Sequence, residues 1–174
     1  MKEMMRYGFI LAVICIGASL SLATVNSFTK SRIIAQAQAE EKNSLAEVLT
    51  GAVRFEAVKL NDEVVYYKAY DKDDRIVGVA FKANAKGYAS NIETLAGMDQ
   101  QGAITAIKII SQNETPGLGA RIEERDFTSQ FANRDLKGLA EVQAITGATI
   151  SSKAVIDSVK QKAQEVKELL KSAK

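Results

Sequence analysis

The sequence predicts an α+β protein in which one membrane helix near the N-terminus precedes an antiparallel sheet and a long C-terminal helix. Three observations support this fold class. Residues 7–25 contain no charged side chain. Segments of β-type composition between residues 64 and 110 are separated by turn residues. Residues 151–171 contain apolar residues at helical spacing and no Gly or Pro. Strands and helices in separate runs along a chain are typical of α+β domains.

The composition excludes several classes of protein. Histidine is absent and Cys15 is the single cysteine, which excludes histidine-based triads, histidine-ligated haem, histidine metal sites and internal disulfides. The net charge is +2 and no run of five like charges occurs, so nucleic-acid binding has no electrostatic support. A length of 174 residues suits one domain with an accessory segment.

Residues 7–25 are the predicted membrane segment. These 19 residues span about 28 Å as a helix, which is close to the hydrocarbon thickness of a bilayer. The run is longer than the core of a signal peptide, which favours an uncleaved anchor. A cleaved signal is the alternative, because residues 35–37 read Ala-Gln-Ala and loosely resemble a cleavage site.

The charges that flank residues 7–25 do not set the orientation of this helix. Lys2 and Arg6 precede it, and Lys30 and Arg32 follow it, so the positive-inside rule gives no preference. A short tail inside the cell and a domain outside is the ordinary arrangement of a signal anchor, and we expect it here.

Local signals predict the remaining elements. Residues 33–49 are rich in Ala and lack Gly, which predicts a helix that stops near Gly51. We expect strands at 64–70, 75–82, 92–98 and 103–110, a hairpin turn at 71–74, a short helix that includes 127–131 and a long helix from about 151 to about 171. The predicted organisation is a tail and anchor at 1–32, a connecting helix at 33–50 and a soluble domain at 51–174.

A hydroxyl-rich turn lies directly before the last helix. Residues 146–152 read Thr-Gly-Ala-Thr-Ile-Ser-Ser. Backbone N–H groups at a helix start lack intrahelical acceptors, and the helix dipole adds positive potential there, so this turn suits a phosphate group. The alternative is that Thr149, Ser151 or Ser152 only caps the helix.

Two further loops carry residues suited to a flat ligand. Residues 114–119 read Glu-Thr-Pro-Gly-Leu-Gly and contain the only proline, and Pro followed by Gly fits a type II turn. Its glycines would let the backbone approach a ligand closely, and Thr115 offers a hydroxyl. In residues 86–88, Tyr88 offers a ring for stacking. A rigid surface turn and an ordinary core or surface tyrosine are the alternatives.

Taken in chain order, the apolar segment, the Lys-Gly-Tyr loop at 86–88, the loop at 114–119 and the turn at 146–152 resemble the FMN-binding domain family. The similarity covers nearly the whole chain, including the hairpin at 67–78. Within the family it is greatest for the G subunits of Rnf electron-transport complexes. The C subunits of sodium-pumping NADH:quinone reductases come next, and they are typically longer than this chain.

The resemblance implies a covalent flavin site. It places FMN on the hydroxyl of Thr149 as a phosphoester, within a turn formed with Thr146, Gly147, Ala148 and Ser151. It places Glu114, Thr115, Gly117, Leu118 and Gly119 beside the flavin, with Gly87 and Tyr88 as further contacts. It implies no catalytic residue and no metal ligand in this chain.

The resemblance also implies a function and partners. The chain would relay electrons through FMN as a redox subunit of a membrane complex that couples ferredoxin and NAD to ion transport, and it would not be catalytic alone. Expected partners are the other subunits, the lipid bilayer and a flavin transferase that installs FMN from FAD outside the cytoplasm, with no nucleic acid. The alternatives are a stand-alone anchored extracytoplasmic flavoprotein and a non-redox anchored binding module.

This chain departs from the family pattern at two places. The family usually has Asp three residues before the first Ser/Thr of the flavin motif, and this chain has Gln143. The family loop often reads Gly-Tyr-Gly-Gly, whereas residues 87–90 read Gly-Tyr-Ala-Ser. We expect flavin attachment to proceed despite Gln143, because residues 146–149 are intact.

Overall fold

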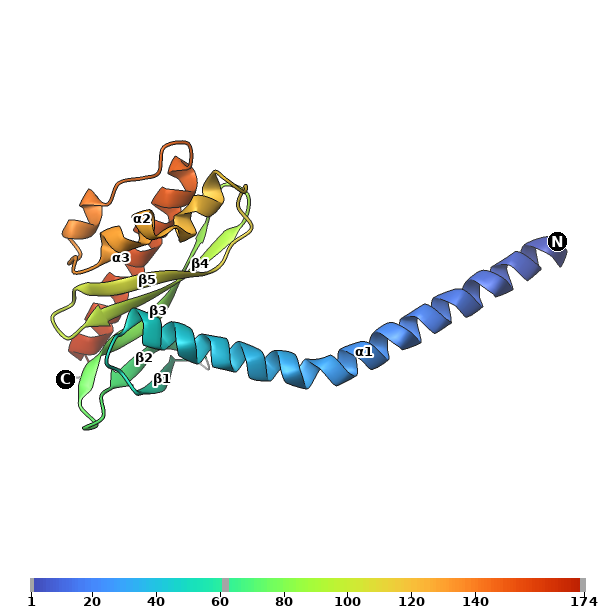
Figure 1. The fold of residues 1–174 in the computed structure, drawn as a ribbon, viewed down its shortest axis with the longest axis horizontal. Helices are drawn as coiled ribbons and strands as arrows, with labels where there is room; N and C mark the ends of the chain where they lie inside the picture. The colour runs from blue at the N-terminus through green and yellow to red at the C-terminus, as the bar shows by residue number, and fades with distance from the viewer. Residues whose placement is uncertain (1, 61–62, 173–174) are drawn as a thin grey trace. The chain divides into compact units, whose positions relative to one another are not determined.

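The computed structural model describes residues 2–60 and 63–172 (Figure 1). Residue 1 of the predicted segment 1–32 therefore lies outside the described residues, as do residues 61–62 and 173–174 of the predicted segment 51–174. The main elements are α1 (Lys2–Val48), β1 (Arg54–Leu60), β2 (Glu63–Tyr70), β3 (Ile76–Lys86), β4 (Asn91–Asp99), β5 (Ile104–Ser111), α2 (Arg125–Thr128) and α3 (Thr149–Ser172). Three short 3₁₀ helices accompany them: η1 (Gly119–Glu123), η2 (Ser129–Phe131) and η3 (Gly138–Glu141). The chain divides into two compact units, Met1–Glu41 and Lys42–Lys174.

The first unit consists of the N-terminal part of α1. Its stretch Met4–Lys30 has a mean hydropathy of 2.3 and is long and apolar enough to cross a membrane. The predicted membrane segment at 7–25 lies inside this stretch. The hydroxyls of Ser21, Thr24 and Thr29 donate to backbone carbonyls four residues earlier, so these polar groups are satisfied within the helix, as an apolar environment requires.

The second unit is built on a five-stranded antiparallel sheet in the order β1-β2-β3-β4-β5. Strand follows strand without a crossover, and α3 packs against β3 and β4. The predicted strands are confirmed as β2 to β5, with ends that differ by at most four residues. The α+β prediction, with an N-terminal apolar helix and a long C-terminal helix, is therefore confirmed.

Strand β1 was not predicted from the sequence. It is an edge strand, most of its side chains are exposed, and its register with β2 shifts between Val58 and Lys59. An exposed and bulged edge strand lacks the regular alternation of apolar and polar residues that marks half-buried strands.

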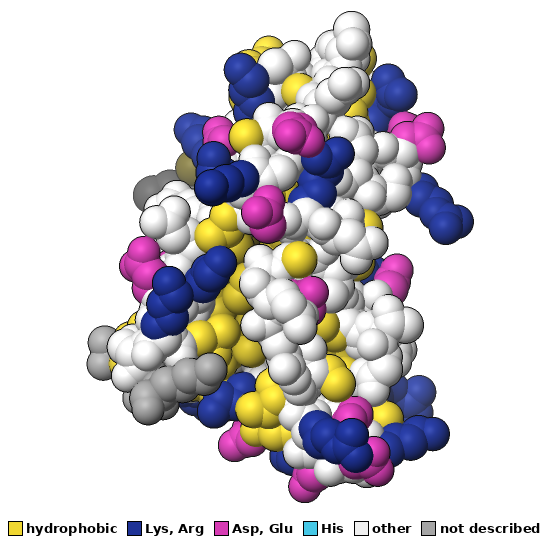
Figure 2. All heavy atoms as spheres, turned by 90° about the vertical axis from the view of Figure 1, so that its left-hand side faces the viewer, with side chains coloured by type: hydrophobic (Ala, Val, Ile, Leu, Met, Phe, Trp, Pro, Cys, Tyr) yellow, Lys and Arg dark blue, Asp and Glu magenta, His cyan; other side chains and the backbone are white. Residues whose placement is uncertain are grey.

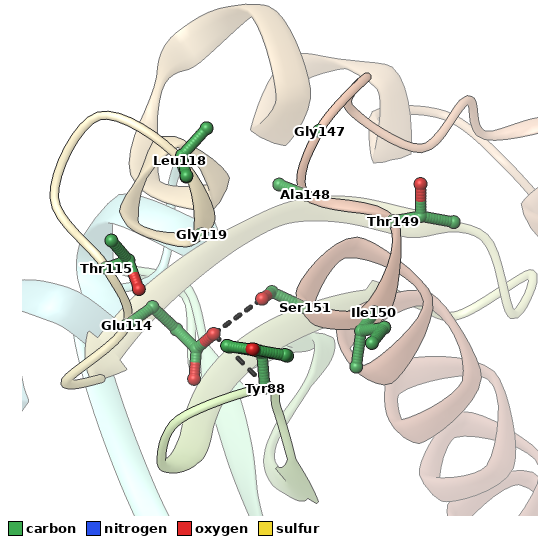
Figure 3. Close-up of a pocket in the computed structure, with 10 residues that line it drawn as sticks. All are labelled: Tyr88, Glu114, Thr115, Leu118, Gly119, Gly147, Ala148, Thr149, Ile150 and Ser151. Carbon is green, nitrogen blue, oxygen red and sulfur yellow. Dashed lines mark hydrogen bonds between the residues drawn. The ribbon is translucent and has the colours of Figure 1, made fainter.

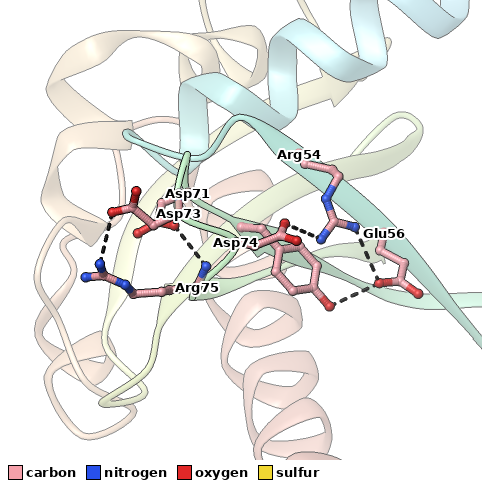
Figure 4. Close-up of polar contacts among 7 residues, drawn as sticks. Arg54, Glu56, Asp71, Asp73, Asp74 and Arg75 are labelled. Atoms are coloured by element: carbon pink, nitrogen blue, oxygen red, sulfur yellow. Dashed lines mark hydrogen bonds and ion pairs between the residues drawn. The ribbon is translucent and has the colours of Figure 1, made fainter.

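Polar contacts hold β1 and the neighbouring hairpin turn together (Figure 4). Arg54 contacts Asp74 at 2.7 Å and lies 4.0 Å from the centre of the Tyr70 ring. In the turn, Oδ1 of Asp71 accepts hydrogen bonds from the N–H groups of Asp73 and Arg75. These contacts confirm the hairpin turn predicted at 71–74, where Asp74 adopts a left-handed conformation with φ of 61°.

The sheet has a hydrophobic core on each face. The larger core lies between the sheet and α3 and includes Phe81, Met98 and Val155. On the opposite face, Leu45 and Val48, from the part of α1 that belongs to the second unit, pack on the sheet. Figure 2 shows one side of the molecule, where charges of both signs are interspersed around hydrophobic side chains.

The predicted helices are present with shifted ends. Residues 33–48 are helical without a break from the preceding residues, and Gly51 adopts φ of 96° after the helix end. The short helix predicted at 127–131 corresponds to α2 followed by η2. Helix α3 begins at Thr149, two residues before the predicted start, so the hydroxyl-rich turn leads directly into its first turn.

Candidate functional site

A cavity of about 430 Å³ opens between the loop after β3, the segment after β5 and the first turn of α3 (Figure 3). This volume lies within the range of small-molecule sites, about 300–1,000 Å³. The cavity is lined by Tyr88, Glu114, Thr115, Leu118, Gly119, Gly147, Ala148, Thr149, Ile150 and Ser151. Three segments that are distant in sequence therefore meet at one site.

The start of α3 presents backbone donors to this cavity. Ala148 precedes the helix, and the first N–H with a carbonyl acceptor in the helix is that of Ser152, which donates to the Ala148 oxygen at 2.9 Å. The N–H groups of residues 149–151 come before this bond and have no acceptor one turn earlier. Across residues 2–60 and 63–172, no hydrogen bond from these three groups is found. An alanine in the cap position cannot satisfy them with its side chain.

The hydroxyl groups of the turn are used in different ways. Ser152 Oγ donates to the Ala148 carbonyl at 2.9 Å and accepts from the Ile145 N–H at 3.1 Å. Ser151 Oγ donates to Oε2 of Glu114 at 2.6 Å. Neither serine caps the helix, which removes two of the three capping alternatives. Both serines are buried, whereas Thr149 is exposed and lines the cavity.

Gly147 sets the path of the chain into α3. Its φ is +83°, in the left-handed region that L side chains rarely adopt. The nearest atom to a Cβ at this position would be Cδ2 of Leu118, at 3.6 Å, which is an ordinary contact. Glycine is therefore required here by the backbone conformation. A Cβ would have enough space.

Glu114 is the most connected residue of the site. Its Oε1 accepts hydrogen bonds from the N–H groups of Ala89 (3.0 Å) and Ser90 (2.9 Å), and its Oε2 accepts from the Tyr88 N–H at 3.2 Å and from Ser151. Only 5% of the residue is exposed, so the carboxylate is buried in the wall of the cavity.

The surroundings of Glu114 keep its carboxyl group ionised. Burial by itself raises the pKa of this group. The hydrogen bonds from Ser151 and from the N–H groups of Ser90, Ala89 and Tyr88 act in the opposite direction, and the net result is a pKa below the usual value of a glutamate. The site therefore contains a buried negative charge whose partners are all hydrogen-bond donors.

Two glycines make room for this carboxylate. A Cβ at Gly87 would lie 2.6 Å from Oε1 of Glu114, and a Cβ at Gly119 would lie 2.8 Å from its Oε2. Contacts below 3.0 Å essentially never occur for a real Cβ, so both positions must be glycine while Glu114 keeps its place.

Exposed apolar side chains surround the mouth of the cavity. Tyr88 is 71% exposed, Ile150 57% and Leu118 51%. Large apolar side chains with this exposure offer contact area to a ligand that covers them. The arrangement combines apolar surface with a helix N-terminus, and so it fits a flat aromatic ligand that carries a phosphate.

The structure brings together most of the residues that the sequence pointed to. Nine of them line the cavity: Tyr88, Glu114, Thr115, Leu118, Gly119, Gly147, Ala148, Thr149 and Ser151. Gly87 is buried against Glu114 rather than lining the cavity, and Gly117 is exposed with φ of +74° and no neighbour within 4 Å of a Cβ. Thr146 lies in an adjacent hollow of about 260 Å³ together with Gln143. Ile150 was not predicted, although its position next to Thr149 was a usable signal.

Comparison with known proteins places this site in context. Residues 87–164 match the FMN-binding domain model, and residues 1–48 match the RnfG N-terminal region. The chain is 32% identical to the G subunit of the ion-translocating oxidoreductase complex of Methanosarcina acetivorans, with 91% of this chain and 92% of the relative covered. It is 34% identical to the G subunit of the Na(+)-translocating ferredoxin:NAD(+) oxidoreductase complex of Acetobacterium woodii, with 98% and 95% covered. Among solved structures, Shewanella oneidensis NqrC aligns with a TM-score of 0.49 and 18% identity over 65% of this chain and 66% of that chain.

Proposed function

The chain belongs to the family of G subunits of ion-translocating oxidoreductase complexes, and we propose that it serves in such a complex as an electron-carrier subunit that holds FMN. The observation that carries this proposal is the cavity at the start of α3. It lies within the part of the chain that matches the FMN-binding domain, and it combines unpaired helix N–H groups with an apolar rim.

The residues of the cavity fit the two ends of FMN. The N–H groups of residues 149–151 and the dipole of α3 suit the phosphate. Tyr88, Leu118 and Ile150 offer apolar surface to the ring system. FMN, when bound, supplies one- or two-electron transfer, and the protein supplies attachment, orientation and electrostatics.

We propose Thr149 as the residue that carries FMN covalently. Of the four hydroxyls in residues 146–152, those of Ser151 and Ser152 are buried and hydrogen-bonded. Thr146 faces the adjacent hollow. Thr149 is exposed and lines the cavity, so its hydroxyl is the one available at the helix N-terminus. A flavin transferase would move the FMN group from FAD to Thr149 Oγ1, with AMP as the leaving group and loss of the hydroxyl proton.

Ion transport belongs to other subunits in this proposal. Residues 7–25 contain no charged side chain, and a single apolar helix provides no pathway for an ion. The chain is therefore a redox subunit that anchors a cofactor at the membrane, and it does not catalyse the overall reaction alone. In this proposal its partners are the other subunits of the complex, which the names of its relatives describe as a ferredoxin:NAD(+) oxidoreductase complex.

We further propose that the second unit lies outside the cytoplasm and that residues 7–25 anchor it without cleavage. The length of the apolar stretch supports an anchor. Protease added to intact spheroplasts should remove a tag fused after residue 174 and leave a tag before residue 1 protected. The reverse pattern would contradict this topology. N-terminal sequencing that begins near residue 37 would instead indicate a cleaved signal.

The proposed function is tested by purifying the complex from membranes through a tag on this chain, in a host that contains the transferase. We expect other redox subunits to copurify, and we expect the visible flavin absorbance of this chain to bleach when reduced ferredoxin is added. A yellow chain without redox partners would favour a stand-alone flavoprotein. A colourless chain would favour a non-redox binding module.

A further inference from the structure

We propose that Glu114 is a positioning residue of the flavin pocket. Its carboxylate ties the loop at residues 87–90 to the first turn of α3 and thereby fixes Tyr88 at the cavity, without binding the flavin itself. The proposal deepens the proposed function, on which it rests for the identity of the ligand.

The hydrogen bonds of Glu114 connect segments that are otherwise separate in sequence. Three consecutive N–H groups, those of residues 88–90, converge on the carboxylate at 2.9–3.2 Å. Ser90 Oγ lies 3.4 Å from Oε1. Ser151, in the first turn of α3, donates at 2.6 Å from 37 residues further along the chain. Figure 3 shows the carboxylate of Glu114 connected by hydrogen bonds to both Ser151 and Tyr88.

Because of these contacts, the carboxylate of Glu114 has little capacity to accept further hydrogen bonds from a ligand. Each carboxylate oxygen already accepts at least two hydrogen bonds, and only 5% of Glu114 is exposed. Gly87 and Gly119 enclose the group from two sides, so that a Cβ on either would collide with it. Glu114 therefore borders the cavity as part of its wall, and its effect on a bound flavin must pass through the groups that it holds.

Tyr88 is the group whose position depends most on these bonds. Its side chain is 71% exposed, so packing does not fix it, and the backbone of residues 88–90 must do so. Successive N–H groups that point to one side form an anion-binding concavity, and Glu114 occupies it as an internal anion. All its partners are donors, so a glutamine would place an NH₂ group against N–H groups and lose bonds to one or more segments.

The proposal is tested by hydrogen exchange of the full chain in detergent, prepared without flavin. In Glu114→Gln, exchange of the amides at residues 88–90 should rise by about tenfold, because each loses a charged acceptor. Exchange in the centre of α3 should stay unchanged. The control is Glu123→Gln, an equivalent change at an exposed carboxylate that accepts from Gln112. Unchanged exchange at residues 88–90 in Glu114→Gln would overturn the proposal.

A second readout uses the flavin spectrum of the loaded protein. Glu114→Gln should change the flavin fluorescence in the parent background and add nothing in a Tyr88→Leu background, because the effect passes through Tyr88. The same change in both backgrounds would mean that Glu114 acts on the flavin directly, and the proposal would fail. Because the exchange experiment contains no flavin, a protein that never carries FMN would contradict the proposed function without changing that result.

If Glu114→Gln does not fold, exchange will be fast throughout β3, β4 and α3. A milder variant, Ser151→Ala, then tests the proposal. Ser151→Ala removes one bond to Glu114 and retains those from residues 88–90. We expect faster exchange of the Ser152 amide, which is hydrogen-bonded to the Ala148 carbonyl in the first turn of α3, together with an altered flavin spectrum. If neither changes in Ser151→Ala, the tie between the loop and α3 does not position the site.

Discussion

Gly119 lies so close to Glu114 that a Cβ at position 119 would stand 2.8 Å from both Cβ and Oε2 of Glu114. Any larger residue at 119 therefore competes with the buried carboxylate for the same space. The sequence suggested that the glycines of residues 114–119 let the backbone approach a ligand. In the structure, Gly119 lines the cavity and also makes room for the side chain of Glu114.

Substitution of two glycines in this loop separates these explanations. Gly119→Ala should displace Glu114, shift the flavin absorbance and lower the free energy of unfolding by about 1–3 kcal/mol, as overpacking does. Gly117→Ala meets no atom within 4 Å but has φ of +74°, so it should cost only about 1–2 kcal/mol of backbone strain and leave the flavin spectrum unchanged. Absorbance spectra and urea unfolding of both loaded variants measure this. Identical flavin spectra for parent and Gly119→Ala would contradict the interpretation.

The ionised form of Glu114 should make stability depend on pH. The folded-state pKa of this group is lowered by its hydrogen bonds, so its contribution is fully present above the unfolded value of about 4.3 and is lost as pH falls through the lower folded value. The difference in free energy of unfolding between the parent and Glu114→Gln should therefore be constant near neutral pH and shrink below about pH 4. Urea unfolding of the parent and of Glu114→Gln at a series of pH values measures this difference.

Thr94 offers a test of the core beneath α3. Its hydroxyl is fully buried in β4 and has no hydrogen-bond partner within the described part of the chain. Thr94→Val keeps the shape and removes the unpaired group, so the free energy of unfolding should rise by about 1 kcal/mol. Thr105→Val on the neighbouring strand should lower it by a similar amount, because the Thr105 hydroxyl donates to the Val48 carbonyl. Equal signs for the two variants would contradict this interpretation.

Gln143 is the place where this chain departs from the usual flavin motif. It lies in the hollow that also contains Thr146, and its N–H donates to Oε1 of Gln130 at 2.9 Å. Gln143→Asp should accelerate flavin attachment, because a carboxylate restores a charge that a metal-dependent transferase can use. A time course of in-gel flavin fluorescence for parent and variant with the same transferase measures the rates. If only the Asp variant becomes labelled, the parent has lost its covalent cofactor.

Local sequence signals predicted the elements whose apolar residues follow a regular pattern. The alternation in β5 and the apolar period of α3 each reflect burial along one face, and the uncharged run at 7–25 is long and apolar enough to cross a membrane. Strand β1 was missed because its edge position and its bulge remove the regular alternation of apolar and polar residues. In each case the pattern of burial decides whether the element can be recognised.

The residues of the candidate site could be predicted from the sequence, but the hydrogen bonds between them could not. The turn at 146–152 and the loop at 114–119 were recognisable from their residue types and from family resemblance. The burial of Glu114 was not, because it depends on N–H groups from residues 88–90 and on Ser151, which approach only in the folded chain. For the same reason, the sequence could not show that Gly87 and Gly119 make room for a carboxylate.

Mass spectrometry of the purified chain shows whether the hydroxyl of Thr149 carries FMN. The full chain is expressed with a flavin transferase, and the peptide at residues 138–153 is fragmented, because it contains Thr146, Thr149, Ser151 and Ser152 together. We expect one FMN adduct on Thr149 in the parent and in Thr146→Val, and none in Thr149→Val. An adduct that persists in Thr149→Val, or that maps to another hydroxyl in the parent, would contradict it.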